Sequence, residues 1–533
     1  MKKGFKILTG MQPFIQNQDL TYINKCLDFD YVLDNRFKMS TTASTKQTET
    51  NLFAAPLFRK VNSLVPNKRR SFAFEIADRK SLLYLIDMLF ILVAIGAYCT
   101  WLYPEIGAKE LISDYYGWLL SGVVFWSFFS YVFDLYSLEN IDNFYSTLKY
   151  LLVASSLTIL AYLASPWFTP SLPDSKLAVF LFAFNVIAPL VVWRYTYFRL
   201  LDRPIFLKRV LVVGAGWSSK SLIDVFANGD AFNFHLGYKV VGIIDSDTKE
   251  VVYKGVRIVN GTNDFAKLVR RLKIDEIIVE ETSETNNSAA LRELTKCRMN
   301  GAAVTSLSDF YERLTGRVLI NAAAQNFHLA FPYNRNNFRR AYLTFSRALD
   351  ICFGLVGTLL CVVLIPFVYV SNFFGSRGPL FYKQERVGLY GKTFCITKFR
   401  SMVVDAEKNG AAWAQQNDSR ITSVGRFLRR SRIDELPQAW SVLKGDMSLI
   451  GPRPERPVFV QQLKKEIPFY DTRHLAKPGI TGWAQAIYKY GSNTQDALMK
   501  VQYDLYYLKN RSIMMDIKVL LKTISVVVRF KGM

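Results

Sequence analysis

Two adjacent carboxylates, Asp434 and Glu435, stand in the chemically most informative stretch of this 533-residue sequence. A Gly-Pro-Arg-Pro turn that carries Arg453 follows them, and a basic run precedes them, made up of Arg426, Arg429, Arg430 and Arg432. Acids among so many cations suit a site that binds phosphate, neutralises its charge and attacks it. A solvent-facing acidic pair is the ordinary alternative, and the surrounding residues argue against it.

The two acids are expected to have different roles. Neighbouring side chains on a helix point about 100° apart, so this pair is less suited to share one proton. One carboxylate can attack phosphorus and form an acyl phosphate. The other can hold Mg²⁺, whose charge reduces the repulsion between an anionic nucleophile and an anionic phosphate.

Several basic residues nearby are candidates for binding phosphate. Lys398 and Arg400 lie close together and could clamp a diphosphate, although basic residues near a membrane also contact lipid headgroups. Arg453 lies between two prolines, which fix the backbone and so the direction of the guanidinium. It is a candidate for stabilising charge on the transferred phosphate. Lys477 stands in a second rigid Pro-Gly turn.

The composition indicates a membrane protein with anionic partners. Hydrophobic residues make up 50% and aromatic residues 14% of the chain, and the formal net charge is +23. Phospholipid headgroups and nucleotides fit that charge, whereas the long apolar runs and the lack of a recognition module argue against nucleic acid. The six scattered cysteines and three histidines leave acid–base or nucleophilic work to carboxylates.

Four apolar stretches predict a transmembrane bundle of four helices over residues 76–200. They run from about 82–103, 116–133, 150–164 and 177–193. Basic clusters before the first and after the fourth place both ends of the bundle in the cytoplasm. Residues 1–75 are polar and lack a secretory signal, so we expect a cytoplasmic, partly disordered tail. A buried soluble helical core is the alternative for the four stretches.

Residues 205–325 predict a parallel α/β domain of Rossmann-like type, because strand-like and helical patterns alternate. One strand leads into Gly214 and Gly216, but Ser219 stands where a dinucleotide fingerprint has its third glycine. Asp245 ends the second strand and could contact a ribose. The pattern favours a structural or regulatory remnant over a working nucleotide site, and both interpretations stay open.

A fifth apolar run, within residues 347–374, differs from the other four. Arg347 and Arg377 flank it, and basic residues on both sides place both ends in the cytoplasm. Pro366 would break the helix, and the part before it covers about 22 Å, short of the ~30 Å hydrocarbon thickness. We therefore predict a re-entrant membrane helix that bends near Pro366. An ordinary span kinked by proline is the alternative.

Six strings in the C-terminal part carry a resemblance to a known family: RALD (347–350), GPLFYKQERVG (378–388), KFRSM (398–402), RIDELPQAWSVLKGDMSLIGPRPE (432–455), KPGITGWAQ (477–485) and YDLYYLKN (503–510). Together they resemble the polyprenyl-phosphate hexose-1-phosphate transferases, which are large monotopic phosphoglycosyl transferases of the undecaprenyl-phosphate glucose/galactose phosphotransferase type. The resemblance implies a mixed α+β monotopic catalytic domain over residues 340–533. The bundle and the α/β domain also look like the N-terminal half of the large members.

The resemblance implies a two-step transfer. Asp434 would attack the sugar-linked phosphate of a UDP-sugar, release UMP and form a covalent aspartyl-phosphosugar. Undecaprenyl phosphate would then take the phosphosugar, in the first membrane step of exopolysaccharide, capsule or O-antigen synthesis. Glu435 would complete the dyad, with Mg²⁺ on Asp434 and Glu435, while Arg429 and Arg453 would contact phosphate. A homodimer in the bacterial inner membrane, in contact with phospholipid, is also implied.

One position departs from the family pattern. Many members have a serine before the helix-breaking proline, whereas this chain has Ile365. A serine hydroxyl could satisfy backbone groups freed by the break, so a bend here needs another source of stabilisation. The sugar is not identified by the sequence: the family favours glucose and galactose, and N-acetylated sugars stay open.

Two other functions remain as alternatives. A membrane-anchored nucleotide-sugar epimerase or dehydratase would need a complete glycine fingerprint and a Tyr-x-x-x-Lys pair. Ser219 interrupts the first, and no tyrosine beyond Gly216 has a lysine four positions later. A non-catalytic assembly scaffold is the other alternative, and the intact acidic pair and Arg453 argue against it.

Overall fold

The computed structural model describes residues 76–528 apart from short gaps at 106, 137–143, 171–174, 202–206, 229–236, 246–250, 261–264, 282–287, 321–338, 376–377, 407, 409–417 and 489–492. All the described residues belong to one unit, residues 71–533. The predicted tail over residues 1–75 and the flanking Arg377 lie outside the described residues.

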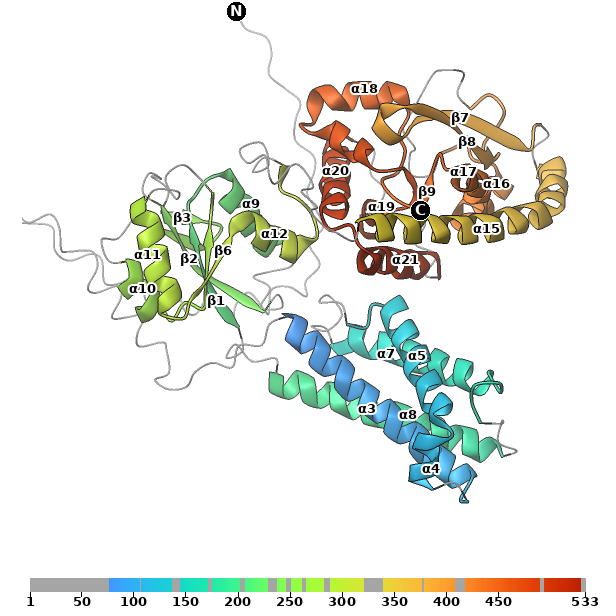
Figure 1. The fold of residues 1–533 in the computed structure, drawn as a ribbon, viewed down its shortest axis with the longest axis horizontal. Coiled ribbons are helices and arrows are strands. Elements are labelled where there is room, and N and C mark those ends of the chain that lie inside the picture. Colours follow the sequence, from blue (N-terminus) through green and yellow to red (C-terminus); the bar gives the residue numbers. More distant parts are fainter. Residues whose placement is uncertain are drawn as a thin grey trace, which may run out of the picture. The chain divides into compact units, whose positions relative to one another are not determined.

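The N-terminal part is a bundle of apolar helices, namely α3 (Ile76–Leu102), α4 (Ala108–Ser113), α5 (Tyr116–Val132), α7 (Phe144–Leu163) and α8 (Lys176–Leu201). All four predicted stretches form helices. By length and apolar composition α3, α7 and α8 could each cross a membrane, whereas α5 is shorter. Trp126, Leu151 and Leu190 are fully buried in the core of the bundle. Figure 1 shows α3 and α8 as the two longest helices of this bundle.

A buried charged pair connects two of these helices. The Arg194 guanidinium on α8 bonds the Asp87 carboxylate on α3 at 2.5 Å, and both side chains are almost inaccessible to solvent. Tyr136 donates to the same carboxylate oxygen at 2.7 Å. Charges inside an apolar bundle are costly unless they are paired, so this contact fixes the register of α3 against α8.

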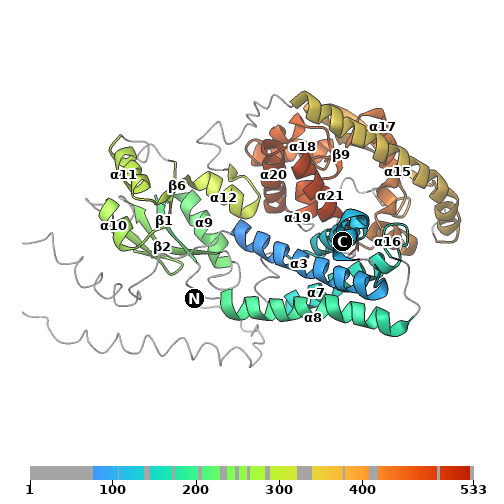
Figure 2. The ribbon, with the colours of Figure 1, turned by 60° about the horizontal axis from the view of Figure 1, so that its bottom comes forward.

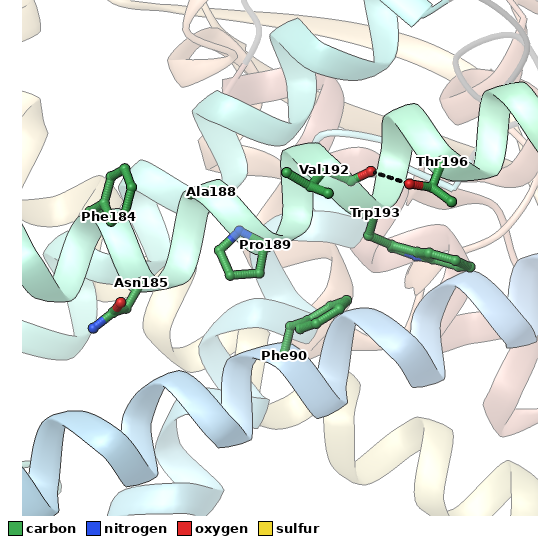
Figure 3. A pocket seen from close by; sticks show the side chains of 8 residues that line it. All are labelled: Phe90, Phe184, Asn185, Ala188, Pro189, Val192, Trp193 and Thr196. Atoms are coloured by element: carbon green, nitrogen blue, oxygen red, sulfur yellow. Dashed lines mark hydrogen bonds between the residues drawn. The ribbon is translucent and has the colours of Figure 1, made fainter.

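A hollow of about 430 Å³ opens on α8 beside α3 (Figure 3). It is lined by Phe90, Phe184, Asn185, Ala188, Pro189, Val192, Trp193 and Thr196. The Thr196 hydroxyl donates to the Val192 carbonyl of its own helix at 2.9 Å. The lining contains no acidic or basic side chain, so it suits hydrocarbon rather than phosphate chemistry.

The middle part contains a mixed six-stranded sheet in the order β3-β4-β2-β1-β5-β6. Its strands are β1 (Lys208–Val213), β2 (Tyr238–Asp245), β3 (Val252–Tyr253), β4 (Val256–Asn260), β5 (Glu276–Val279) and β6 (Ala303–Ser306). Every pairing is parallel except that of β3 with β4. The order places β1 at the centre of the sheet, between β2 and β5.

Helices cover both faces of this sheet (Figures 1 and 2). They are α9 (Trp217–Asn228) and α12 (Leu307–Thr315) on one side and α10 (Phe265–Arg271) and α11 (Ser288–Met299) on the other. Leu222 of α9 and Phe310 of α12 are buried in one apolar cluster with Val212 of β1. Strands and helices alternate along this part of the chain except at β2, β3 and β4, which follow one another. The predicted parallel sheet is therefore a mixed one, because β3 pairs with β4 in antiparallel.

The C-terminal part combines one long helix with short helices and strands. They are α15 (Arg339–Gly375), β7 (Phe381–Val387), η4 (Leu389–Gly391), β8 (Thr393–Phe399), α16 (Ser423–Arg430), η5 (Ile433–Gln438), α17 (Ala439–Lys444), β9 (Ser448–Ile450), α18 (Pro457–Glu466), η6 (Tyr470–Leu475), β10 (Gly479–Thr481), α19 (Trp483–Ile487), α20 (Thr494–Lys509) and α21 (Ile513–Val528). β7 and β8 form an antiparallel hairpin, and β9 pairs in parallel with β10.

The long helix α15 passes through Pro366 without losing helical structure, so the predicted break in the helix is not observed. In both ribbon views it curves toward one end (Figures 1 and 2). Cys361 before the proline and Val368 after it belong to one apolar cluster with Phe399 and Leu428 of the C-terminal part. Both sides of the proline therefore pack against the same set of elements.

The first turns of α15 are tied to the same part by polar contacts. Arg347 donates to the carbonyls of Val442 and Leu443 at the end of α17, at 2.7 and 2.6 Å. The Asp350 carboxylate accepts from the Ser448 hydroxyl at 2.9 Å and from the Leu449 N–H at 2.7 Å.

The outer side of α15 is apolar and exposed, with Leu355, Leu359, Val362, Phe367 and Phe374 among its exposed residues. An apolar surface of this extent suits contact with lipid. By length and composition alone, α15 also qualifies as a candidate membrane span, over Arg340–Phe374.

Candidate functional site

The two predicted acids lie on the short 3₁₀ helix η5, which directly follows α16. The Thr422 hydroxyl caps α16 by accepting from the Gly425 N–H at 2.9 Å. Arg432, at the junction, has a φ of 59°, in the left-handed region that residues other than glycine rarely adopt. Asp434 and Glu435 are each only 7% exposed. Because successive residues of a 3₁₀ helix are about 120° apart, the two carboxylates enter different surroundings.

Cations surround Glu435. The Lys398 ammonium and one Arg453 terminal nitrogen each bond the Oε1 atom of Glu435 at 2.8 Å. Arg432 approaches the Oε2 atom at 3.3 Å. Burial raises the pKa of this carboxyl, but the charges of Arg453, Lys398 and Arg432 outweigh it and hold the pKa well below its ordinary value. Glu435 is therefore a permanent anion.

Asp434 has a different electrostatic environment. Burial, together with the negative charge of Glu435, raises its pKa to about 6. Lys398, Arg429 and Arg453 act in the opposite direction and keep the rise moderate. A carboxylate with a raised pKa is more basic and hence a better nucleophile, while it remains mostly ionised near neutral pH.

Adjacent acids whose pKa values are pushed apart are typical of a catalytic pair with two roles. In this pair Glu435 bonds three cations. Asp434 is the more basic of the two carboxylates, because its pKa is raised whereas that of Glu435 is lowered.

Three of the predicted phosphate-binding residues lie around the dyad. Lys398 and Arg453 bond Glu435 directly, as described. Arg429 lies close enough to lower the pKa of Asp434, and its Nε atom donates to the Ser401 hydroxyl at 2.9 Å. Three cations on β8, on α16 and in the turn after β9 thus converge on one pair of carboxylates.

The other two predicted phosphate-binding residues have contacts with glycines of other segments. The Arg400 guanidinium packs against Gly378, and the side chain is buried. The Lys477 ammonium lies beside Gly445 together with Arg347, at the C-terminal end of α17.

Two turns that are distant in sequence interlock to place Arg453. β9 pairs with β10, so the Gly-Pro-Arg-Pro turn after β9 meets the Pro-Gly turn before β10. Gly479 donates to the Pro452 carbonyl at 2.9 Å, and Gly451 donates to the Thr481 carbonyl at 2.9 Å. A Cβ atom on Gly479 would lie 2.1 Å from the Gly451 nitrogen, so only glycine permits this approach.

The site also contains a residue that the sequence reasoning did not single out. Gln485, on α19, accepts at its Oε1 atom from the second terminal nitrogen of Arg453 at 2.8 Å. Its only signal in the sequence was its place at the end of the KPGITGWAQ string. Arg473 is a second such residue, because it donates to the Arg453 carbonyl at 2.9 Å and to Asp504 at 2.8 Å.

The dyad fits Mg²⁺ only together with a substrate. Among the described residues no group of three or more His, Cys, Asp or Glu side chains could hold a metal by itself. Mg²⁺ commonly binds through one or two carboxylates completed by substrate phosphates and water. Asp434 and Glu435 supply two such carboxylates, but Glu435 already accepts bonds from three cations.

The glycine-rich loop of the sheet domain is filled by the protein itself. Glu280, at the end of β5, is 7% exposed, and its carboxylate accepts from the Gly216 N–H at 2.9 Å and the Ser218 N–H at 3.2 Å. The Ser219 hydroxyl adds a third bond at 2.7 Å. A Cβ atom on Gly216 would lie 2.5 Å from the Glu280 carboxylate, and one on Gly214 2.9 Å from its Cβ. The carboxylate lies at the N-terminus of α9, where a phosphate would bind in a dinucleotide site.

Residues 341–530 match the family model described as bacterial sugar transferase. The chain is also similar to three curated proteins. It is 52% identical over 132 residues to a putative undecaprenyl-phosphate N-acetylgalactosaminyl 1-phosphate transferase of Bacillus subtilis, covering 25% of this chain and 74% of that protein. It is 29% identical over 346 residues to the undecaprenyl-phosphate galactose phosphotransferase of Salmonella typhimurium, covering 62% of this chain and 70% of that protein.

The third relative is the UDP-N-acetylgalactosamine-undecaprenyl-phosphate N-acetylgalactosaminephosphotransferase of Aeromonas hydrophila. It is 41% identical over 239 residues, which cover 44% of this chain. The match spans about half the length of that relative, 55%. The family match includes the dyad and each of the cations that bond Glu435.

Proposed function

Since this chain belongs to the bacterial sugar transferase family, we propose that it transfers a sugar 1-phosphate from a UDP-sugar to undecaprenyl phosphate and releases UMP. The names of all three relatives contain undecaprenyl phosphate as acceptor. The observation that carries the proposal is the environment of the dyad, where one acid is neutralised by cations and the other has a pKa of about 6. The relatives are named for different sugars, so the sugar is not assigned.

In the first step, an oxygen of the ionised Asp434 attacks the phosphorus that carries the sugar. The bond from that phosphorus to the bridging oxygen breaks, and UMP leaves with the electron pair. An aspartyl-phosphosugar remains on the enzyme. The raised basicity of Asp434 supports this role, because Glu435 is too strongly stabilised by its cations to act as the nucleophile.

In the second step, an oxygen of undecaprenyl phosphate attacks the same phosphorus. The bond to the Asp434 oxygen breaks, which restores the carboxylate and yields undecaprenyl-diphospho-sugar. Arg453 and Lys398, which both bond Glu435, lie near Asp434 and stabilise negative charge on the transferred phosphate in both steps. Mg²⁺, held by the dyad carboxylates and the substrate phosphates, would offset further negative charge.

The reaction joins a soluble donor to a lipid acceptor, so the site must lie at the membrane surface. We place the protein in the bacterial inner membrane, with both ends of the bundle and the dyad on the cytoplasmic side, where UDP-sugars are made. The contacts of α15 on both sides of Pro366 support a re-entrant helix rather than a span. The ion pair of Lys522, on α21, with Asp134, after α5, at 2.5 Å supports the same side for that loop and the C-terminal part.

The proposal is tested by incubating membranes that contain the protein with undecaprenyl phosphate and a panel of UDP-sugars. We expect release of UMP with at least one sugar. The Asp434→Asn variant is expected to abolish it, because an amide is a poor nucleophile. Rapid quench and mass spectrometry of the wild-type protein should show an added phosphosugar.

Release of UDP instead of UMP would indicate an ordinary glycosyl transferase and contradict the proposal. Full activity in Asp434→Asn, with no phosphosugar adduct on the wild-type protein, would contradict the proposed covalent intermediate. The family match favours a transferase over an epimerase or dehydratase, because the matched region carries the dyad. A non-catalytic scaffold would release no UMP in this assay.

A further inference from the structure

Arg453 is held at both ends of its guanidinium. One terminal nitrogen bonds Glu435 and the other bonds the Gln485 Oε1 atom, each at 2.8 Å. The guanidinium is planar, with its donors in a fixed fork. Two acceptors on its two terminal nitrogens therefore fix both the position of the group and the plane in which it lies. Glu435 alone would fix only one of these nitrogens.

The orientation of the Gln485 amide follows from its partner. Arginine has only donors, so the amide must present its oxygen to Arg453. The amide nitrogen is then buried and finds no hydrogen-bond partner in the part of the chain that the structure describes. A buried donor without a partner destabilises the folded state. An apolar side chain of the same length would avoid that cost, whereas the amide offsets it through the bond that its oxygen accepts from Arg453.

The acceptor at this position is neutral, and its neutrality matters for the chemistry. Glu435 already offsets part of the positive charge of Arg453. A second carboxylate on the other nitrogen would cancel the remaining charge, which the substrate phosphate needs. An amide oxygen holds the guanidinium in place and leaves that charge available.

The position of Gln485 is itself fixed by its neighbours on α19. Gly482, directly before α19, lies so close to the Gly451 carbonyl that a Cβ atom would be 2.1 Å from its oxygen. The Trp483 indole donates to the Gly316 carbonyl at 2.8 Å. Both contacts anchor α19 to the turn that carries Arg453, on one side, and to the end of α12, on the other.

We propose that Gln485 is a positioning residue for the transfer: its amide oxygen holds Arg453 in the orientation that stabilises the transferred phosphate, without neutralising it. The inference rests on the proposed function, because it assigns Gln485 a role in that reaction.

The test is a double-mutant cycle on UMP release, with UDP-N-acetylgalactosamine, UDP-galactose and UDP-glucose as donors. Gln485→Met keeps the length of the side chain and removes the acceptor. We expect kcat to fall about 10- to 100-fold, as for the loss of a hydrogen bond to a charged group, with a much smaller change in KM. Arg453→Lys keeps a charge but cannot bond both acceptors. In that background Gln485→Met is expected to cause no further loss.

Two further variants separate this role from packing. Gln485→Glu retains the contact but adds an anion, and we expect it to lower kcat at least as much as Gln485→Met. Gln462→Met, at an exposed glutamine of α18, is the matched control and should keep wild-type activity. Thermal unfolding of each variant should match that of the wild type within a few degrees.

The inference would be overturned if Gln485→Met had the kcat of the wild type. It would also be overturned if the fold-losses in kcat of Gln485→Met and Arg453→Lys multiplied in the double variant. In both cases the proposed function would stand. Loss of activity in proportion to a lowered unfolding temperature would likewise overturn the inference, since it indicates packing alone. If the wild-type protein releases no UMP from any of the donors, the proposed function fails and the role of Gln485 fails with it.

Discussion

At the residue scale, contacts with cations give two chemically similar acids opposite shifts in pKa. Arg453 and Lys398 both bond Glu435, whereas Asp434 feels the same cations at longer range and lies next to a negative charge. Burial alone would raise the pKa of both Asp434 and Glu435. The pKa of Glu435 is lowered because cations contact it directly, and these contacts depend on the tertiary fold.

The pH dependence of the reaction should report on Asp434. Its pKa is raised from the ordinary value to about 6, so its protonated form persists to higher pH than in a free aspartate. A protonated carboxyl cannot attack phosphorus. We therefore expect kcat/KM for UMP release to rise with pH through about 6, to level off above it, and to fall about tenfold per unit well below it.

The measurement is an initial-rate profile from pH 4.5 to 8, with thermal unfolding recorded at each pH to exclude denaturation. Arg429→Gln provides a matched variant. Because Arg429 lowers the pKa of Asp434, its removal should move the acidic limb to higher pH. A profile that is flat down to pH 4.5 would show that no group with this pKa takes part.

The sequence could predict the residues whose chemistry is visible in their type. Lys398, Arg429 and Arg453 were predicted to bind phosphate, and all three lie around the carboxylate pair in the structure. Arg400 and Lys477, predicted to bind phosphate as well, have contacts with Gly378 and Gly445, and their role in binding phosphate stays a prediction. Gln485 was not selected, because a neutral side chain gives no charge signal.

At the element scale, the site depends on backbone contacts between two turns. Gly451, Gly479 and Gly482 lie where a Cβ atom would collide with backbone atoms of the opposite turn. Side chains at these positions would separate β9 from β10 and so move Arg453 away from Gln485. The sequence predicted that both turns are rigid, but not that they interlock, because pairing of distant segments is not encoded in either turn alone.

Gly479→Ala is therefore expected to impair both folding and catalysis. Its Cβ atom would lie 2.3 Å from the Thr481 carbonyl oxygen, and backbone atoms cannot rotate away. We expect a loss of about 1–3 kcal/mol in the free energy of unfolding, as for overpacking. UMP release should fall more than tenfold at a temperature at which the variant remains folded.

Gly117→Ala is the control, since a Cβ atom there has no heavy atom within 4 Å. Differential scanning calorimetry and the UMP assay would be applied to both variants. Wild-type stability and activity in Gly479→Ala would show that the two turns are not in close contact in solution.

The long helix α15 shows the limits of a rule based on one residue. A proline removes a single backbone donor and strains the preceding turn, and a helix can continue past it with a bend. The sequence correctly marked Pro366 as unusual and predicted a break, but α15 remains helical through it. The packing of Cys361 and Val368 on one cluster is a tertiary contact that no local pattern contains.

At the scale of the whole molecule, contacts between parts link the membrane bundle, the sheet domain and the catalytic part. Lys509 bonds Glu312 at 3.0 Å, and Val318 and Ile320, which follow α12, are buried in an apolar cluster of the catalytic part. The predicted domain order along the chain gave no indication of these contacts. They connect α12 with the same region that positions α19.

The proposed topology can be tested by labelling with a membrane-impermeant thiol reagent in intact cells. Single cysteines placed beside Arg347 and beside Arg377 are both expected to resist labelling, because a re-entrant α15 keeps both flanks in the cytoplasm. The native cysteines should be replaced first, since Cys352 and Cys395 are exposed.

Trp167→Cys is the positive control. Trp167 is 85% exposed and lies between α7 and α8, on the side opposite to the predicted cytoplasmic ends of the bundle. It should react with the external reagent. Labelling beside Arg377 but not beside Arg347 would make α15 a true span, and the site would then need a different relation to the membrane.

The loop around Gly214 and Gly216 is occupied by an anionic side chain of the same protein, that of Glu280. The Glu280 side chain satisfies the amide donors of the loop and occupies the space that the two missing side chains leave. The two glycines are thus required by the close approach of Glu280, and their presence does not depend on a bound ligand. A phosphate could bind here only by displacing the Glu280 carboxylate and overcoming the repulsion between the two negative charges. Resemblance to a nucleotide-binding motif is therefore poor evidence that this loop binds a nucleotide.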